Sequence, residues 1–241
     1  MNRLLRYLSN FFVCALFFGY GVASAHYQIF PYHQLIEIKR IIIPNTPPTE
    51  RNREFRVQKF EQSINKSDIV FVGDSLTEAG EWSEFFPNFS ISNRGVTGDK
   101  TSDVLLRLDS IYSTEADYAF LMIGINDIYN NAPLTETVEN YKKIVSSLKD
   151  KGSKVIVQST IQCEKSKCGA DRVHLVNELN QQLMFISRDL DVEFVDLEKL
   201  SQKNGLEATY TYDGKHLSAI GYHAWVSKIS EVLADLQGDS V

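Results

Sequence analysis

Two short segments that lie far apart in the chain carry residue types used in nucleophilic catalysis. Ser75 stands in Gly-Asp-Ser-Leu-Thr, and Asp213 and His216 stand in Asp-Gly-Lys-His-Leu-Ser. A serine hydroxyl is a weak nucleophile, so it needs a base within hydrogen-bond reach and a third group that orients this base. Because Asp213 and His216 are three residues apart, a tight turn would bring the carboxylate to the imidazole N–H. The three residues therefore have types and a spacing that suit acyl transfer.

Acyl transfer also needs hydrogen-bond donors aimed at the oxyanion that forms on the attacked carbonyl. One such donor lowers the barrier by ~3 kcal/mol, so the donors matter as much as the nucleophile and its base. Gly98 lies in Asn-Arg-Gly-Val-Thr-Gly-Asp, and Asn126 lies in Gly-Ile-Asn-Asp. The backbone N–H groups of Ser75 and Gly98 and the side-chain amide of Asn126 are three candidate donors.

Each of these residues also has a purely structural explanation when it is taken alone. Ser75 suits the N-cap of a helix, and Gly98 suits a tight turn. Asn126 is an ordinary residue for a strand-to-helix turn, and Asp213 is ordinary before a glycine. His216 could be a half-buried histidine of the core instead of a base. The choice between structure and chemistry depends on whether the fold brings the five residues together.

From residue 68 onward, mostly apolar runs alternate with helical patterns. One helical pattern is the apolar stripe Val138, Tyr141, Ile144, Val145 and Leu148, with spacings of three and four residues. Strands that alternate with helices of this length predict an α/β fold, a three-layer α/β/α sandwich around a five-stranded parallel sheet. The predicted strands are 69–73, 89–93, 118–123, 154–159 and 192–196.

Three of the candidate residues follow the first three predicted strands. Ser75 comes directly after the first strand, Gly98 just past the second and Asn126 directly after the third. The carboxyl ends of neighbouring parallel strands share one edge of the sheet, where α/β proteins bind their ligands. We therefore expect Ser75, Gly98 and Asn126 to converge at this edge. Asp213 and His216 precede the last predicted helix.

Four short blocks in this chain resemble, in the right order, the four sequence blocks of the SGNH (GDSL) hydrolase family. They are Gly73-Asp74-Ser75-Leu76, the block with Gly98, Gly124-Ile125-Asn126-Asp127 and Asp213-Gly214-Lys215-His216. The resemblance covers roughly residues 66–237, and no block residue is missing. The longer forms of these blocks resemble the branch near platelet-activating-factor acetylhydrolase catalytic subunits and bacterial carbohydrate acetylesterases.

The resemblance implies a flavodoxin-like sheet with strand order 2-1-3-4-5 and esterase chemistry without a metal or a cofactor. It implies that Ser75 is the nucleophile, His216 the base and Asp213 the group that orients His216. Gly98 and Asn126 then complete the oxyanion hole with the Ser75 N–H. The Gly-x-Ser-x-Gly elbow of the general α/β-hydrolase fold is absent, which argues against that fold.

Composition predicts one sizeable domain that does not bind nucleic acid. The chain has 241 residues, of which 43% are hydrophobic, a formal net charge of −6 and no basic run. We assign the hydrolase domain to residues 67–241. Residues 26–66 are interpreted as an arm with a leading helix. Three prolines between positions 44 and 48 exclude a helix or a central strand there.

Residues 1–25 have the three parts of a secretory signal peptide. Arg3 and Arg6 precede an apolar run, and Ala23-Ser24-Ala25 supplies the small residues of a cleavage site. The alternative is an uncleaved membrane anchor, which would be the only contact with a membrane. Both readings place the domain outside the cytoplasm, either periplasmic or secreted, or anchored and facing outward.

Two cysteines remain once this leader is removed. Cys163 and Cys168 lie close together after the fourth predicted strand. In an oxidising compartment they most simply form one disulfide, and two free thiols are the alternative. No His or third Cys lies nearby, and structural zinc needs four ligands, so a metal site is not favoured. The loop lies outside the four blocks and borders the predicted site.

The predicted function is an exported serine esterase that removes short acyl groups, expected to be acetyl, from a glycan or similar envelope substrate. A lysophospholipase or thioesterase acting on longer acyl chains is the first alternative. An acyltransferase, in which a sugar hydroxyl replaces water as the acceptor, is another. A non-catalytic binding module is disfavoured by the intact set of Ser75, Asn126, Asp213 and His216. The sequence carries no signal of oligomeric state.

Overall fold

The computed structural model describes residues 2–27, 30, 48–62, 66–197, 200–202 and 205–238. The chain divides into two units, Met1–Arg51 and Asn52–Val241. The first unit contains helix α1 (Asn2–Tyr27). None of the helices in these described ranges has the length and apolar character needed to cross a bilayer. Residues 28–29, 31–47 and 63–65 of the predicted arm lie outside the described residues.

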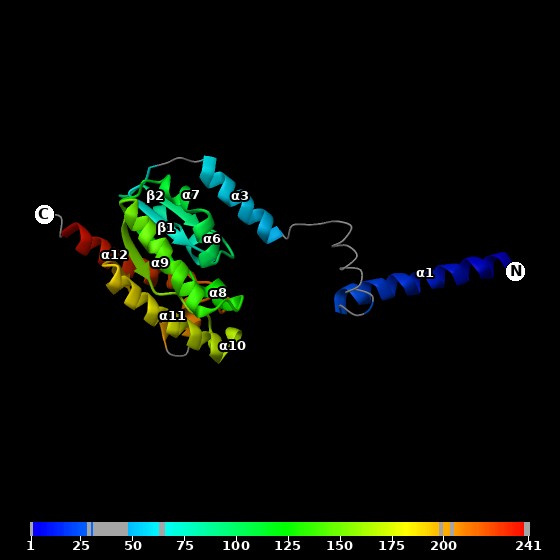
Figure 1. Ribbon diagram of the computed structural model, residues 1–241. Coiled ribbons are helices and arrows are strands. Elements are labelled where there is room, and N and C mark those ends of the chain that lie inside the picture. The colour runs from blue at the N-terminus through cyan, green and yellow to red at the C-terminus, as the bar shows by residue number, and fades with distance from the viewer. Residues whose placement is uncertain are drawn as a thin grey trace. The chain divides into compact units, whose positions relative to one another are not determined.

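The second unit is built on a five-stranded parallel sheet, which confirms the predicted fold class (Figure 1). Its strand order is β2-β1-β3-β4-β5, the order that the family resemblance implied. The strands are β1 (Ile69–Gly73), β2 (Ile91–Gly95), β3 (Tyr118–Met122), β4 (Lys154–Gln158) and β5 (Glu193–Val195).

The prediction was wrong about the bounds of β2, which lies two residues later than 89–93. The residues at 89 and 90 make other bonds. The Phe89 N–H closes a turn onto a preceding carbonyl at 3.1 Å, and the Ser90 N–H donates to the Asp68 carboxylate at 2.7 Å. The ladder therefore starts at Ile91 and pairs along the full length of β1.

Alternate strand residues face opposite layers of helices. Val70, Val72, Ala119 and Leu121 pack in one core, and Ile69, Phe71, Phe120 and Met122 pack in the other. The first core is covered by α6 (Thr101–Leu106), α7 (Leu108–Tyr112), α8 (Ile125–Tyr129), α9 (Leu134–Asp150) and α11 (Ala170–Asp189). The second is covered by α5 (Trp82–Phe85) and α12 (Ala219–Gly238). Figure 1 shows α9 and α11 side by side in front of the sheet.

Helix α3 (Pro48–Gln62) leads into the sheet, as the sequence predicted for this region. It begins at the last of the prolines between 44 and 48, so the exclusion of helix was one residue too broad, because proline is tolerated in the first turn of a helix. Arg56 lies over the ring of the buried Phe60, with 5.2 Å to its centroid. The Arg56 Nε–H also donates to the Gly95 carbonyl at 2.5 Å, so α3 is fixed to the end of β2.

Helix α4 (Ser75–Glu78) is a single turn seated directly on the ends of β1 and β2. A Cβ added at Gly95 would overlap the backbone nitrogen of Glu78, and one added at Gly73 would overlap the Met122 carbonyl oxygen. Only glycine at the ends of these two strands allows the helix to sit this close. The start of α4 is therefore placed by backbone packing.

Asp74, not Ser75, is the N-cap of α4. Its Oδ1 accepts a hydrogen bond from the Leu76 N–H at 3.0 Å, while Oδ2 is buried with no hydrogen-bond partner in the described part of the chain. Burial raises the pKa of Asp74 to about 7, helped by the nearby Asp99 and Asp127 carboxylates and opposed by the Leu76 bond. An ionised carboxylate is thus unfavourable at this position.

We expect Asp74→Asn to raise the free energy of unfolding at pH 8 but not at pH 4. The pKa of Asp74 is raised in the folded state, so its contribution to stability is fully present below about pH 4 and is lost as the pH rises through about 7. Asparagine keeps an oxygen for the Leu76 N–H and has no charge. The difference between variant and wild type should grow from pH 4 to 8, up to about 4 kcal/mol. Urea titrations across this pH range measure it.

Asp68→Asn is the matched control with the opposite sign. Hydrogen bonds from the backbone and side chain of Ser90 lower the pKa of Asp68. The folded state therefore favours the ionised form of Asp68, and removing this charge should not raise the free energy of unfolding at pH 8. If the difference in the free energy of unfolding between Asp74→Asn and wild type were the same at pH 4 and pH 8, this would contradict the raised pKa of Asp74 as its cause.

Candidate active site

The structure brings Ser75 and His216 together although 141 positions separate them. Ser75 is the first residue of α4, at the end of β1, and its Oγ lies 3.3 Å from the His216 Nε2. Because Asp74 takes the capping role, the Ser75 hydroxyl is not used to cap the helix. The helix-cap explanation of Ser75 is therefore wrong, and the hydroxyl faces the imidazole.

Asp213 holds His216 from the other side of the ring. Its Oδ2 lies 2.7 Å from the His216 Nδ1, and its Oδ1 accepts the backbone N–H groups of Lys215 at 2.8 Å and of His216 at 2.7 Å. Burial works to raise the pKa of Asp213, but the hydrogen bonds from His216 and Lys215 outweigh it and lower the pKa to about 2. The carboxylate is thus ionised at neutral pH and only accepts, so Nδ1 carries the hydrogen and a neutral His216 presents its Nε2 lone pair to Ser75.

Gly98 and Asn126 meet at the same edge of the sheet. The Asn126 Nδ2–H donates to the carbonyl oxygen of Asp99, the residue after Gly98, at 3.0 Å. Gly98 has a φ of 83°, which favours glycine, and an added Cβ would meet no atom within 4 Å. Its N–H makes no hydrogen bond within the ranges that the structure describes. The Gly98 turn is therefore open and is tied directly to the Asn126 side chain.

A buried ion pair behind the Gly98 turn was not predicted from the sequence. The Asp99 carboxylate accepts from the Arg107 Nε at 2.6 Å and from the Arg53 Nε at 2.7 Å. A second nitrogen of Arg107 donates to the Gly73 carbonyl at 3.3 Å. Burial raises the pKa of Asp99, and the two arginines oppose that rise. The pair thus ties the Gly98 turn to the end of β1, and only the position of Asp99 beside Gly98 hinted at it.

Asp127, the neighbour of Asn126, is also buried and structural. Its carboxylate accepts from the Thr101 N–H at 3.0 Å and from the Thr101 Oγ1–H at 2.6 Å. The Asn140 amide donates to the same Thr101 oxygen at 3.2 Å. Burial raises the pKa of Asp127, and the Thr101 bonds oppose it. The network fixes the start of α6 against α8, which carries Asn126.

Helix α4 is held by hydrogen bonds from three other elements. The Tyr222 hydroxyl of α12 donates to the Leu76 carbonyl at 2.7 Å, and the Trp82 indole N–H donates to the Thr77 carbonyl at 2.8 Å. The Asn93 amide of β2 also donates to Thr77, at 3.0 Å. Nothing in the sequence pattern marks Tyr222 for this role. These bonds keep the Ser75 end of α4 in one orientation.

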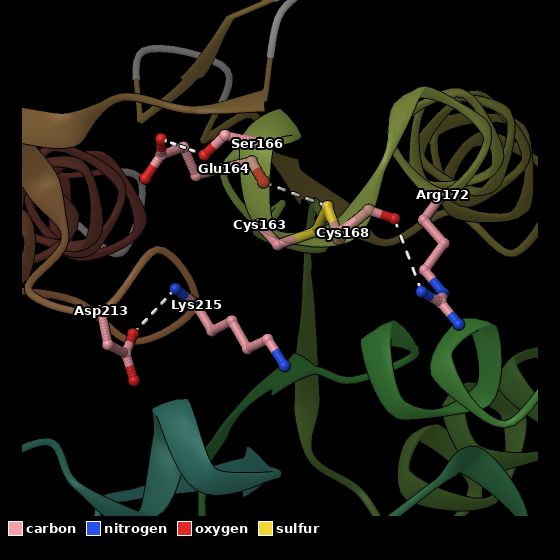
Figure 2. Close-up of a disulfide and its surroundings, with 7 residues drawn as sticks. All are labelled: Cys163, Glu164, Ser166, Cys168, Arg172, Asp213 and Lys215. Carbon is pink, nitrogen blue, oxygen red and sulfur yellow. Dashed lines mark hydrogen bonds between the residues drawn. A yellow bond between two sulfur atoms is a disulfide. The ribbon is translucent and has the colours of Figure 1, made fainter.

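Cys163 and Cys168 form a disulfide bond next to the site (Figure 2). The bridge closes a loop that contains α10 (Lys165–Cys168). The side chains of Arg172 and Lys215 both lie over the ring of Tyr129 in α8, at 5.4 and 5.1 Å from its centroid. The loop, Tyr129 and the turn of Asp213 and His216 are therefore neighbours.

The candidate site is open to solvent. The side chains of Asp213 and His216 are each 39% exposed. A cavity of about 560 Å³ lies elsewhere, between α11 and the ends of β4 and β5, where Thr160, Asn177 and Phe194 are part of its lining and no candidate residue contributes. In the described ranges, no three His, Cys, Asp or Glu side chains are grouped so that they could hold a metal ion.

Comparisons with solved structures find the same fold. A Streptococcus pneumonia protein assigned as a platelet activating factor is 27% identical, with a TM-score of 0.70, over 83% of this chain and 97% of its own. A GDSL-like lipase from Bacteroides thetaiotaomicron is 20% identical, with a TM-score of 0.67, over 77% and 98%. An acetyl xylan esterase is 21% identical, with a TM-score of 0.61, over 68% and 98%.

Comparisons of sequence lead to a curated relative and to a family. An N-acylneuraminate cytidylyltransferase from Escherichia coli O18:K1:H7 (strain RS218 / NMEC) is 21% identical over 73% of this chain. The chain spans 42% of the length of that relative. Residues 71–224, which contain all five candidate residues, match the sequence profile of the GDSL-like lipase/acylhydrolase family. On that match, the chain is a member of the GDSL-like lipase/acylhydrolase family.

Proposed function

We propose that this protein is an exported serine esterase that hydrolyses short acyl esters, principally acetyl esters, on a glycan or similar envelope substrate. The observation that carries the proposal is the hydrogen-bonded chain from Ser75 through His216 to Asp213. This is the arrangement that activates a serine hydroxyl for attack on an acyl carbon. Membership of an acylhydrolase family supports an ester as the substrate.

The proposed reaction has two halves. Ser75 Oγ attacks the acyl carbon while His216 Nε2 takes the hydroxyl proton, and the N–H groups of Ser75 and Gly98 with the Asn126 amide stabilise the oxyanion. The intermediate collapses to an acyl-serine, and His216 gives the proton to the departing alcohol. Water then attacks the acyl-serine with His216 as base, which releases the carboxylic acid and restores Ser75. The ionised Asp213 stabilises the imidazolium in both halves.

Three observations support a small acyl group on a bulky alcohol. The exposed Asp213 and His216 leave the alcohol side of the site open, which suits a polymer or a large glycan. Acetyl xylan esterases share the fold, and by their name they act on acetylated xylan. The 560 Å³ cavity is not lined by the candidate residues, so it offers no evident groove for a long acyl chain at Ser75.

Replacement of the proposed nucleophile tests the mechanism. Ser75→Ala should lower kcat for p-nitrophenyl acetate by at least about 1,000-fold, because no other group can form the acyl intermediate. Its melting temperature should stay close to that of the wild type, since Asp74 and not Ser75 caps α4. Ser230→Ala is the control, because Ser230 is exposed on α12 and its hydroxyl donates to the Val226 carbonyl of the same helix. Substantial turnover by Ser75→Ala would refute the assignment.

A series of substrates tests the acyl group. We expect kcat/KM to be highest for p-nitrophenyl acetate and to fall for the butyrate and the octanoate, since none of the five candidate residues lines the 560 Å³ cavity that could take a long chain. The measurement is initial rate against concentration for each ester. A preference for octanoate would instead favour a lysophospholipase or thioesterase. Binding to an acetylated glycan without hydrolysis of any ester would favour a binding module.

Cleavage of the leader tests export. We expect protein recovered from the exported fraction of a producing cell to begin at His26, directly after Ala23-Ser24-Ala25. Mass spectrometry of the intact N-terminus measures this. Recovery in the membrane fraction with residues 1–25 retained would support the uncleaved anchor instead. Recovery from the cytoplasm with an intact leader would argue against export.

A further inference from the structure

We propose that the loop closed by Cys163 and Cys168 is a brace that positions the turn of Asp213 and His216, and that it acts through one backbone hydrogen bond, from Glu164 to Gly214. The proposal rests on the function proposed above and assigns Glu164 and the two cysteines as positioning residues. None of them touches the reacting atoms. The loop instead fixes the turn that carries the base and the group that orients it.

The contact between loop and turn is direct. The Glu164 N–H donates to the Gly214 carbonyl at 2.7 Å. Gly214 is buried, has a φ of 86°, and lies between Asp213 and the residue before His216. A Cβ added to it would overlap the side chain of Lys167, so the loop packs against the backbone of the turn. Figure 2 shows the cross-linked loop beside the turn that carries Asp213 and Lys215.

Apart from the contact between His216 and Ser75, the described residues offer one hydrogen bond that holds this turn from outside. The Asp213 carboxylate bonds within the turn, to Lys215 and His216, and the Thr211 hydroxyl also bonds within it. Within the described ranges, the bond from Glu164 is the one hydrogen bond that joins residues 212–215 to a segment outside 209–218. The internal bonds shape the turn, and the Glu164 bond sets where it stands relative to Ser75.

The loop can act as a brace because its own ends are fixed. Cys163 is 1% exposed and Cys168 is 6% exposed, and both pack with Val173 and Tyr129. The Cys163 carbonyl accepts the Leu206 N–H at 3.1 Å. The disulfide holds the far end of α10 against this fixed point. Without it, a four-residue helix would have little to keep it ordered, because isolated helices this short are unstable.

Loss of the brace should therefore lower kcat. A misplacement of about 1 Å between reacting groups costs on the order of 100-fold in rate. Ser75, Gly98 and Asn126 are carried by the sheet and do not depend on the loop. Binding of the ester should thus be preserved while proton transfer through His216 becomes slower.

Glu164→Pro removes the bond and Glu164→Ala keeps it. Glu164 has a φ of −60°, which proline adopts, and proline has no N–H to give to Gly214. We expect Glu164→Pro to lower kcat for p-nitrophenyl acetate by 10- to 100-fold, on the order of the cost of such a misplacement, with KM unchanged. Glu164→Ala should stay within about 2-fold of wild type, because its backbone N–H is retained and only the side-chain contact with Ser166 is lost.

Reduction of the disulfide completes a double-perturbation cycle. Dithiothreitol gives two electrons and two protons to the Cys163–Cys168 bond, which yields two thiols and the cyclic oxidised reagent. Reduced wild type should lose kcat by a factor similar to that of Glu164→Pro. Reduction of Glu164→Pro should cause no further loss, since both changes break the same contact. Cys163→Ser with Cys168→Ser should behave as reduced wild type without any reductant.

Hydrogen exchange gives a readout that does not depend on catalysis. Amides in the peptide 209–218 should exchange faster in reduced wild type and in Glu164→Pro, whereas amides of β1 and β3 should not change. This result stands even if Ser75→Ala retains activity and the proposed function fails. The brace would be overturned if reduction left both kcat and amide exchange unchanged. It would also be overturned if reduction and Glu164→Pro caused additive losses of kcat, or if the loss of activity were confined to KM. If Glu164→Pro does not fold, reduced wild type decides.

Discussion

The in-register parallel pairing of β1 with both β2 and β3 is the constraint on which the site depends. Gly73 lies opposite Gly95 on one side and Met122 on the other, so three strands end at one level. The chain then leaves each strand through a segment that carries Ser75, Gly98 or Asn126. Because the sheet is buried on both faces, a shift of register would expose its core, and the three groups therefore keep a fixed separation.

Burial separates the carboxylates of this region into two kinds. Asp74, Asp99 and Asp127 lie in the interior beneath the site, and burial raises the pKa of each. Asp213 lies at the surface, and its hydrogen bonds from His216 and Lys215 lower its pKa to about 2. Only an ionised Asp213 holds the imidazole with Nε2 free to accept. The buried carboxylates instead anchor backbone and the ends of helices.

Local patterns were sufficient to predict the alternation of strands and helices and to mark the five candidate residues, because sequence blocks and strand ends are properties of short segments. The strand order was predicted only from the resemblance to a known family. Features that need long-range pairing were not predictable. The bond from Arg107 to Asp99 depends on burial that no short window shows. The error at β2 has the same origin, since Asp68 captures Ser90 from a different segment. Asp74 and Ser75 are both good helix caps, and only the packing of α4 on Gly95 decides between them.

The two halves of the candidate site differ in what holds them. The half with Ser75, Gly98 and Asn126 is fixed by the sheet and by the buried pair of Asp99 and Arg107, so it opens only when the core opens. The half with Asp213 and His216 lies on an exposed turn, which such packing does not secure. A covalent bridge next to that turn compensates for the missing core, and a disulfide persists in an oxidising compartment. The proposed export and the proposed brace are thus linked, because a compartment that keeps the bridge closed would also keep the turn in place.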